Sequence, residues 1–128
     1  MSVVHEGQTF FNESAPDVPR HLWIVLSDEG APRIALVNLS SVPPYPCSHE
    51  PTTFEPEEIA ALKYRSYVRC DKARLADAGQ LTQAEQGGLI QTSRDADAAV
   101  LEKARRAVAD CSIVPNELKD LLRQQGLL

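Results

Sequence analysis

The stretch LWIVL (residues 22–26), together with IALVNL (residues 34–39), decides the fold of this 128-residue chain. Each run is continuously apolar and has the length of a strand, which is typical of strands buried on both faces. Between them, DEGAP (residues 28–32) has the composition of a tight turn, in which Gly30 can adopt positive φ. The pattern therefore predicts two neighbouring antiparallel strands at the centre of a sheet.

Weaker signals on either side of these strands predict the remaining elements. We expect strands over residues 7–11 and 64–70, a short helix that begins at Pro56, a short helix or loop over residues 80–89, and helices over residues 95–111 and from Pro115 onward. The first of the two C-terminal helices has one apolar face, formed by Val100, Ala104 and Val108 among others. These elements predict one α+β, β-rich domain over residues 1–128, in which C-terminal helices close a β-rich N-terminal half.

Residues 42–56 are the least regular part of the chain. They hold five of the nine prolines, which excludes a helix or a central strand there. We expect a long excursion of a kind that is usually functional or disordered. Cys47 and His49 in this segment could supply two zinc ligands, but a structural site needs four and no second close pair follows. We therefore expect no metal and no cofactor.

Composition limits the class of protein. Hydrophobic residues make up 43% of the chain, enough for a core without disulfide or metal crosslinks. The three cysteines are an odd number without a CxxC pair, which favours reduced thiols in a cytoplasm. No apolar run approaches the roughly 20 residues that cross a bilayer, and the N-terminus lacks the pattern of a signal peptide. We expect a cytoplasmic protein that does not enter a membrane.

Charge is unevenly distributed along the chain, whose net charge is −5. Residues 63–74 contain five basic residues against one acidic residue, a local charge of +4, so the rest of the chain carries −9. In a strand over residues 64–70, alternation points one set inward (Tyr64, Ser66, Val68, Cys70) and aligns the other set outward (Lys63, Arg65, Tyr67, Arg69). Such a basic row either steers a phosphate or is a solvated strand face that protects a sheet edge. The sequence leaves both interpretations open.

Polar side chains flank the two central strands at one edge of the sheet. Arg20 and His21 precede the first strand, and Asn38, Ser40 and Ser41 end the second. Antiparallel pairing through the turn would place all five at the same edge. Histidine can transfer protons near neutral pH, arginine can hold a phosphate and serine can donate to a phosphoryl oxygen, as metal-free RNA cleavage requires. Alternatively, the serines only end a strand and the histidine is a satisfied rim residue.

Four stretches carry a resemblance to a known family. They are EGQTFF (6–11), RHLWIVLS (20–27), IALVNLSS (34–41) and YRSYVRCDKARL (64–75). Together they resemble the MazF/PemK toxin family, which implies an SH3-like β-barrel with added helices. The resemblance covers most of the chain through short motifs.

The same resemblance implies metal-independent cleavage of single-stranded RNA by an arginine and a Thr/Ser hydroxyl. Counted back from Ser27, the arginine position falls on His21, with Arg20 adjacent, and the proline position falls on Leu22. The hydroxyl position falls on Ser40. Our candidate catalytic residues are thus Arg20, His21 and Ser40, and our candidate substrate-binding residues are Ser41, Lys63, Arg65 and Arg69.

Two functions from different classes therefore stand open. One is an endoribonuclease toxin of a toxin–antitoxin system, a homodimer held inactive by an antitoxin protein. The other is a catalytically inactive SH3-like barrel that binds a protein or peptide in the same groove. A structural or accessory protein without groove chemistry is a third alternative. Fold resemblance does not separate them, because function depends on the site.

Overall fold

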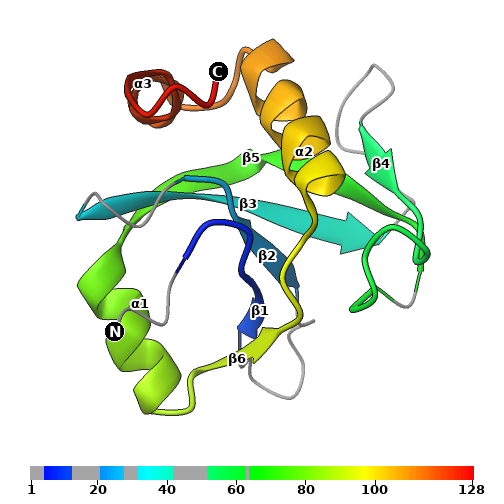
Figure 1. Cartoon of the computed structure of the whole chain (residues 1–128), viewed down its shortest axis with the longest axis vertical. Coiled ribbons are helices and arrows are strands. Elements are labelled where there is room, and N and C mark those ends of the chain that lie inside the picture. Colours follow the sequence, from blue (N-terminus) through cyan, green and yellow to red (C-terminus); the bar gives the residue numbers. More distant parts are fainter. Residues whose placement is uncertain (1–4, 13–20, 28–31, 42–51, 63) are drawn as a thin grey trace.

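Six strands form one curled antiparallel sheet in the computed structural model, which describes residues 5–12, 21–27, 32–41, 52–62 and 64–128 (Figure 1). The strands are β1 (Thr9–Asn12), β2 (Leu22–Val25), β3 (Arg33–Ser41), β4 (Thr53–Phe54), β5 (Ser66–Asp77) and β6 (Ile90–Ser93). Their order across the sheet is β4-β5-β3-β2-β1-β6, and every neighbouring pair is antiparallel. The expected β-rich α+β, barrel-like fold with helices is confirmed at this level.

The two apolar runs pair as expected at the centre of the sheet. Leu22 lies opposite Leu39 and Val25 opposite Leu36 in the β2–β3 register. All residues from 34 to 40 are buried, whereas Trp23 keeps part of its surface exposed. The continuously apolar sequence of β3 thus corresponds to a strand that is covered on both faces. The turn expected over residues 28–32 lies, but for its last residue, outside the described residues.

A large bulge interrupts the β3–β5 ladder. Between the pairs Leu36–Arg74 and Asn38–Arg69, β3 contributes one residue and β5 contributes residues 70–73. Extra residues on one strand bend it and redirect its side chains. Here the bulge leaves Asp71 and Lys72 exposed, next to Arg69.

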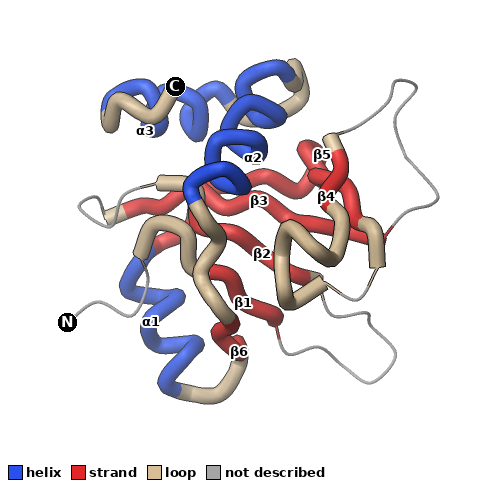
Figure 2. The backbone as a smooth tube through the Cα atoms, turned by 45° about the vertical axis from the view of Figure 1, so that its right-hand side comes forward, coloured by secondary structure: helices blue, strands red, loops and turns tan. Residues whose placement is uncertain are grey.

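Three helices cover the two faces of the sheet (Figure 2). They are α1 (Ala78–Gln86), α2 (Ala98–Asp110) and α3 (Asn116–Gln124). The carboxylate of Asp97 accepts a 2.9 Å hydrogen bond from the Val100 N–H and so caps the first turn of α2. None of the described helices is long and apolar enough to cross a bilayer.

The core consists of two clusters, one on each face. The larger joins Leu22, Ile24, Val37 and Leu39 of the sheet to α2 and α3. The smaller joins Phe10, Val25, Ile34 and Leu36 to the partly buried Leu81 of α1. Alternate residues of each strand supply the two clusters, as the period of two requires.

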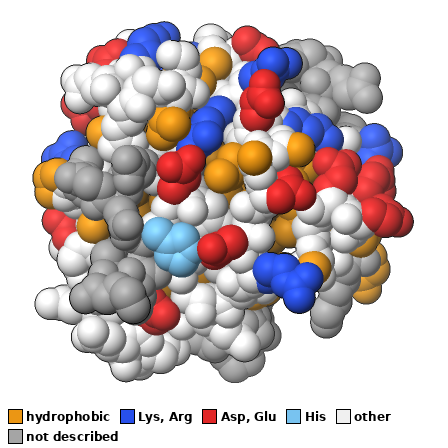
Figure 3. Space-filling model, viewed as in Figure 1, with side chains coloured by type: hydrophobic (Ala, Val, Ile, Leu, Met, Phe, Trp, Pro, Cys, Tyr) orange, Lys and Arg blue, Asp and Glu red, His pale blue; other side chains and the backbone are white. Residues whose placement is uncertain are grey.

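The expected apolar face of α2 packs on the sheet. Val100 is 3% exposed, and Ala104 and Val108 are fully buried. Figure 3 shows Lys or Arg side chains and Asp or Glu side chains on the molecular face that includes this helix. Arg105 also fastens α2 to the sheet, since its Nε donates to the Leu26 carbonyl at 2.9 Å.

Three local expectations were wrong. No helix begins at Pro56, because the segment between β4 and residue 63 forms only single turns, such as the bond from the Glu58 N–H to the Glu55 carbonyl. Tyr64 is 68% exposed rather than inward, since β5 begins at Ser66, where its pairing with β3 ends. Tyr67, which was expected to face outward, is 3% exposed. Residues 80–89 hold the last part of α1 and a turn at Gly88 (φ 77°), which agrees with the expected short helix or loop, and the β6 strand that follows was not predicted.

Candidate functional site at the His21 edge of the sheet

His21 and Ser40 meet at the edge of the sheet where β2 begins and β3 ends. The pairing of Leu22 with Leu39 sets His21 across from Ser40. The His21 Nδ1 atom lies 3.4 Å from the Ser40 Oγ atom. The proximity of these two residues, expected from antiparallel pairing alone, is therefore present in the structure.

The hydrogen-bond geometry fixes the roles of the two side chains. Ser40 is 7% exposed, and its hydroxyl donates to the Oδ1 atom of Asn38 at 3.0 Å. A serine has one proton to donate, so Ser40 can only accept from His21. The neutral imidazole then carries its proton on Nδ1 and its lone pair on Nε2. This tautomer suits a general base that acts through Nε2.

The surroundings of His21 favour the neutral imidazole. Partial burial lowers the pKa of His21 below its usual value, and the positive charges of Arg69 and Lys72 lower the pKa further. Both effects penalise the imidazolium form, burial by desolvation and the cations by repulsion. At neutral pH the side chain is thus in the protonation state that accepts a proton.

Arg69 is held in place by Asp71 on the β5 bulge. Its Nε atom donates to Asp71 Oδ1 at 2.9 Å, and Nη2 bonds the second carboxylate oxygen. The hydrogen bond raises the pKa of Arg69 and lowers that of Asp71, so both groups stay charged. Arg69, Asp71 and Lys72 together carry a net charge of +1 near a neutral His21.

An aromatic and cationic surface continues from this cluster. The Arg74 guanidinium lies 5.0 Å from the centroid of the Trp23 ring, and Phe10 stacks on Trp23 with ring centroids 6.5 Å apart. By strand alternation, Trp23 and Arg74 share the sheet face of Ser40 and Arg69. Positive charge and a partly exposed aromatic ring are a combination that binds single-stranded nucleic acid.

The seven predicted site residues have different outcomes. His21, Ser40 and Arg69 are brought together. Arg65 is directed elsewhere, to Glu55 Oε1 at 3.1 Å and to Thr53 Oγ1 of β4 at 3.4 Å. Arg20 and Lys63 lie outside the described residues, and Ser41 lies in β3 with a side chain that the structure does not describe.

Sequence reasoning did not assign site roles to Asn38, Asp71 or Lys72. Asn38 was expected at this edge, and its contact with Ser40 could have been expected too, because residues 38 and 40 of one strand share a face. Asp71 and Lys72 could not have been found, because nothing in the residue pattern predicts the bulge that places them next to Arg69.

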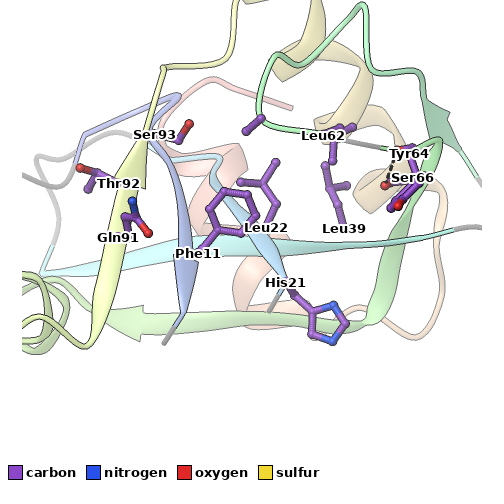
Figure 4. Close-up of a pocket in the computed structure, with 11 residues that line it drawn as sticks. Phe11, His21, Leu22, Leu39, Leu62, Tyr64, Ser66, Gln91, Thr92 and Ser93 are labelled. Atoms are coloured by element: carbon purple, nitrogen blue, oxygen red, sulfur yellow. Dashed lines mark hydrogen bonds between the residues drawn. The ribbon is translucent and has the colours of Figure 1, made fainter. Parts of the chain in front are cut away.

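A pocket of about 460 Å³ opens at the same edge of the sheet, on the opposite face (Figure 4). Its floor consists of Phe11, Leu22 and Leu39, and β6 forms one wall. The other wall is the segment before β5, with Leu62 and Tyr64. The ring of His21 points away from this pocket toward the other side of the sheet (Figure 4).

Within the described ranges, no group of three or more His, Cys, Asp or Glu side chains could hold a metal ion. The Cys47 and His49 pair belongs to residues 42–51, outside those ranges. No model of a known protein family matches the sequence, and no curated protein matches it.

Proposed function

We propose that the protein is a metal-independent endoribonuclease of the MazF/PemK type, built on an SH3-like barrel, that cleaves single-stranded RNA at the His21–Ser40 edge. The observation that carries the proposal is the contact of the Ser40 hydroxyl with a neutral, partly buried His21 beside the cations of the β5 bulge. A base and positive charge placed together are the minimum that cleavage by the 2′-hydroxyl requires.

The chemistry begins with His21. Its Nε2 atom takes the proton of the ribose 2′-hydroxyl, and the 2′ oxygen attacks the adjacent phosphorus. The bond from phosphorus to the 5′ oxygen then breaks, and the imidazolium returns the proton to this departing oxygen. The products are a 2′,3′-cyclic phosphate and a 5′-hydroxyl, and the imidazole regains its starting state. Ser40 keeps the ring in the required tautomer through the Nδ1 contact.

The cations act on the phosphate. Lys72 and Arg69 stabilise the negative charge that grows on the phosphoryl oxygens as the phosphorane forms. A phosphate oxygen competes with Asp71 for the Arg69 guanidinium, which the carboxylate holds in position. Arg20, which precedes His21 in sequence, is a further candidate for this role through the family resemblance.

Two further features of the proposal, a homodimer and an antitoxin protein that blocks the site, rest on the resemblance alone. Action in the cytoplasm rests on the cysteine pattern, which favours reduced thiols. Lys63 and Arg65 stay candidates for contacts to the RNA backbone because they belong to the basic stretch 63–74, and Ser41 stays one because it follows Ser40, although Arg65 pairs with Glu55.

A second function, a catalytically inactive barrel that binds a protein or peptide at this edge, is favoured by one observation. Ser40 is 7% exposed and its hydroxyl is hydrogen-bonded to Asn38, and Arg69 is paired with Asp71. Polar groups that are hydrogen-bonded to one another in this way stabilise the folded edge of a sheet as readily as they support catalysis. Both functions are compatible with the same contacts, so the assay for cleavage decides between them.

The test is incubation of the purified full chain with a mixed single-stranded RNA in the presence of EDTA. Active-site cleavage leaves fragments with 2′,3′-cyclic phosphate ends, and His21→Ala lowers the rate by about a hundredfold or more. His5→Ala is the matched control, because His5 pairs with Asp95 on another part of the chain and plays no part in the proposed chemistry. An RNA pool that stays intact, with a protein partner protecting the His21 edge, would favour the binding function.

A further inference from the structure

Trp23 belongs to a row of side chains that crosses the sheet beside the His21–Ser40 contact. The strand registers pair Trp23 of β2 with Asn38 of β3, and Asn38 with Arg69 of β5. Directly paired residues point to the same face of a sheet, so these three side chains share one face. His21 and Ser40 lie two positions away along β2 and β3, and they form the next row on that face. The ring of His21 points to this side of the sheet (Figure 4).

The indole ring of Trp23 is held in place and is partly exposed. The buried Phe10 ring lies nearly parallel to it, at an angle of 12°, with the ring centroids 6.5 Å apart. The Arg74 guanidinium, on an exposed side chain of β5, lies 5.0 Å from the centroid of the indole. Such a ring can bind a planar group without the entropic cost of ordering its own side chain.

The chemistry of this surface favours a nucleotide as the ligand. A base has a flat π face that stacks on an aromatic side chain, and guanidinium planes stack on bases as well. Since the Arg74 side chain is exposed, its guanidinium can cover the outer face of a base that lies on Trp23. The phosphate joined to that base would meet the positive charge of Arg69 in the same row. One nucleotide therefore supplies a partner for the ring and for both cations.

We propose that Trp23 and Arg74 form a base-binding subsite, which stacks the base of the nucleotide next to the bond that His21 cleaves. This subsite rests on the cleavage function proposed above, to which it adds residues that position the substrate. Two residues of a strand span roughly 6.6 Å, a distance that one nucleotide of an extended strand can bridge. Arg69 shares the row of Trp23, so it can hold the phosphate while the ring holds the base.

Stacking determines how the subsite responds to RNA sequence and to RNA structure. Every base has a π face, so a stacking subsite accepts all four bases. A base inside a duplex is already stacked and paired, so only an unpaired base can lie on the ring. The subsite thus selects single-stranded RNA without specifying its sequence.

The first experiment uses the fluorescence of Trp23, which is the single tryptophan of the chain. The full-length chain is titrated with a short 2′-O-methyl RNA of mixed sequence, which cannot be cleaved because its 2′ oxygens are blocked. A second oligonucleotide has the same backbone without bases. We expect the first to quench the tryptophan emission with saturation. The second should leave the emission unchanged at the same occupancy, which the anisotropy of an end label reports.

Affinities of variants for the same two oligonucleotides separate stacking from charge. Trp23→Leu keeps an apolar side chain against Phe10 but removes the π face. It should weaken binding of the base-bearing oligonucleotide about tenfold and binding of the abasic backbone less than about twofold. Melting curves show whether the variant is folded, and the fluorescence of the native chain needs no substitution.

A matched pair of arginine substitutions tests the second member of the subsite. Arg106 is an exposed arginine of α2, which packs on the opposite face of the sheet. Arg74→Gln and Arg106→Gln remove the same charge, so a difference between them reports the local contact rather than net charge. Arg74→Gln should bind the base-bearing oligonucleotide about threefold or more weakly than Arg106→Gln.

Three results would overturn the subsite. The emission stays constant at saturation with the base-bearing oligonucleotide, or the abasic backbone quenches it equally, or Trp23→Leu loses the same affinity for both oligonucleotides. None of these measurements requires cleavage. Cleavage that depends on His21 but leaves the emission constant would therefore reject the subsite and keep the proposed function. Base-dependent quenching by a chain that does not cleave would support the subsite and count against the proposed function.

Discussion

His21 and Ser40 face each other across the β2–β3 pair, with Nδ1 and Oγ 3.4 Å apart and the serine hydroxyl turned to Asn38. Two consequences follow from this relationship. The serine is an acceptor toward the imidazole, so the histidine lone pair is on Nε2. The site is also tied to the centre of the sheet, so its geometry depends on strands that a rigid core holds in register.

The lowered pKa of His21 predicts how stability depends on pH. Between the folded-state pKa and the usual value of 6.5, the unfolded chain binds more protons at this residue than the folded chain. The contribution of His21 to stability is therefore present above pH 6.5 and is lost as the pH falls. Urea unfolding between about pH 5 and pH 8 should show a larger loss on acidification for the native chain than for His21→Gln. Equal losses in the two proteins would refute the lowered pKa.

The packing of α2 predicts a large difference between two adjacent substitutions. Val100 is 3% exposed in the larger core cluster, whereas the side chain of Ala99 is exposed on the same helical turn. Val100→Asp buries an unpaired charge and should lower the free energy of unfolding by several kcal/mol, on the order of 3–5. Ala99→Asp, near the positive end of the same helix, should change it by less than about 0.5 kcal/mol. Similar denaturation midpoints for the two variants would show that α2 is peripheral.

Gly7 fastens the N-terminal segment between the sheet and the chain that enters α2. Its φ is 86°, its N–H donates to the Val25 carbonyl, and a Cβ atom would lie 3.3 Å from both Ala96 O and Leu101 Cδ1. Gly88 has a similar φ of 77° but no atom within 4 Å of such a Cβ. Each change to alanine adds backbone strain of about 1–3 kcal/mol.

Gly7→Ala should therefore cost more stability than Gly88→Ala, because it adds a steric contact to the same strain. Thermal melts of the two variants measure the difference. The interpretation fails if Gly88→Ala is the more destabilising of the pair.

Asp71 restrains the cation that is proposed to bind phosphate. Asp71→Asn removes a negative charge and weakens the hold on Arg69. Binding of a non-cleavable 2′-O-methyl RNA should tighten, with a steeper dependence on salt, because one more cation then pairs with phosphate. Fluorescence anisotropy over a salt series gives both quantities. Unchanged affinity and an unchanged slope would mean that RNA does not contact the bulge.

The central strands and the His21–Ser40 contact were predictable, and for the same reason. Residues 22–26 and 34–39 are too apolar to lie anywhere but in the core, and their antiparallel pairing brings the flanking residues together. The apolar face of α2 was predictable because Val100, Ala104 and Val108 recur with the helical period.

Other features depend on contacts that no local pattern encodes. β6 has only four residues and little apolar character, so it is a strand because β1 offers a partner edge. The β5 bulge arises where two strands of different length must stay in register at both ends of β3. For that reason Lys72 lies near His21, while Arg65, which was expected in the same row, pairs with Glu55 instead.

The most direct measurement of the central claim is the rate at which a single-stranded RNA labelled at one end is cleaved in EDTA. The rate is compared for the native chain, His21→Ala, Ser40→Ala and His5→Ala. The account predicts fragments with 2′,3′-cyclic phosphate ends, a loss of about a hundredfold or more for His21→Ala, and a smaller loss for Ser40→Ala, which orients the base without taking the proton. His5→Ala should cleave at the native rate. Native rates for His21→Ala, or an RNA pool that stays intact with every protein, would contradict the account.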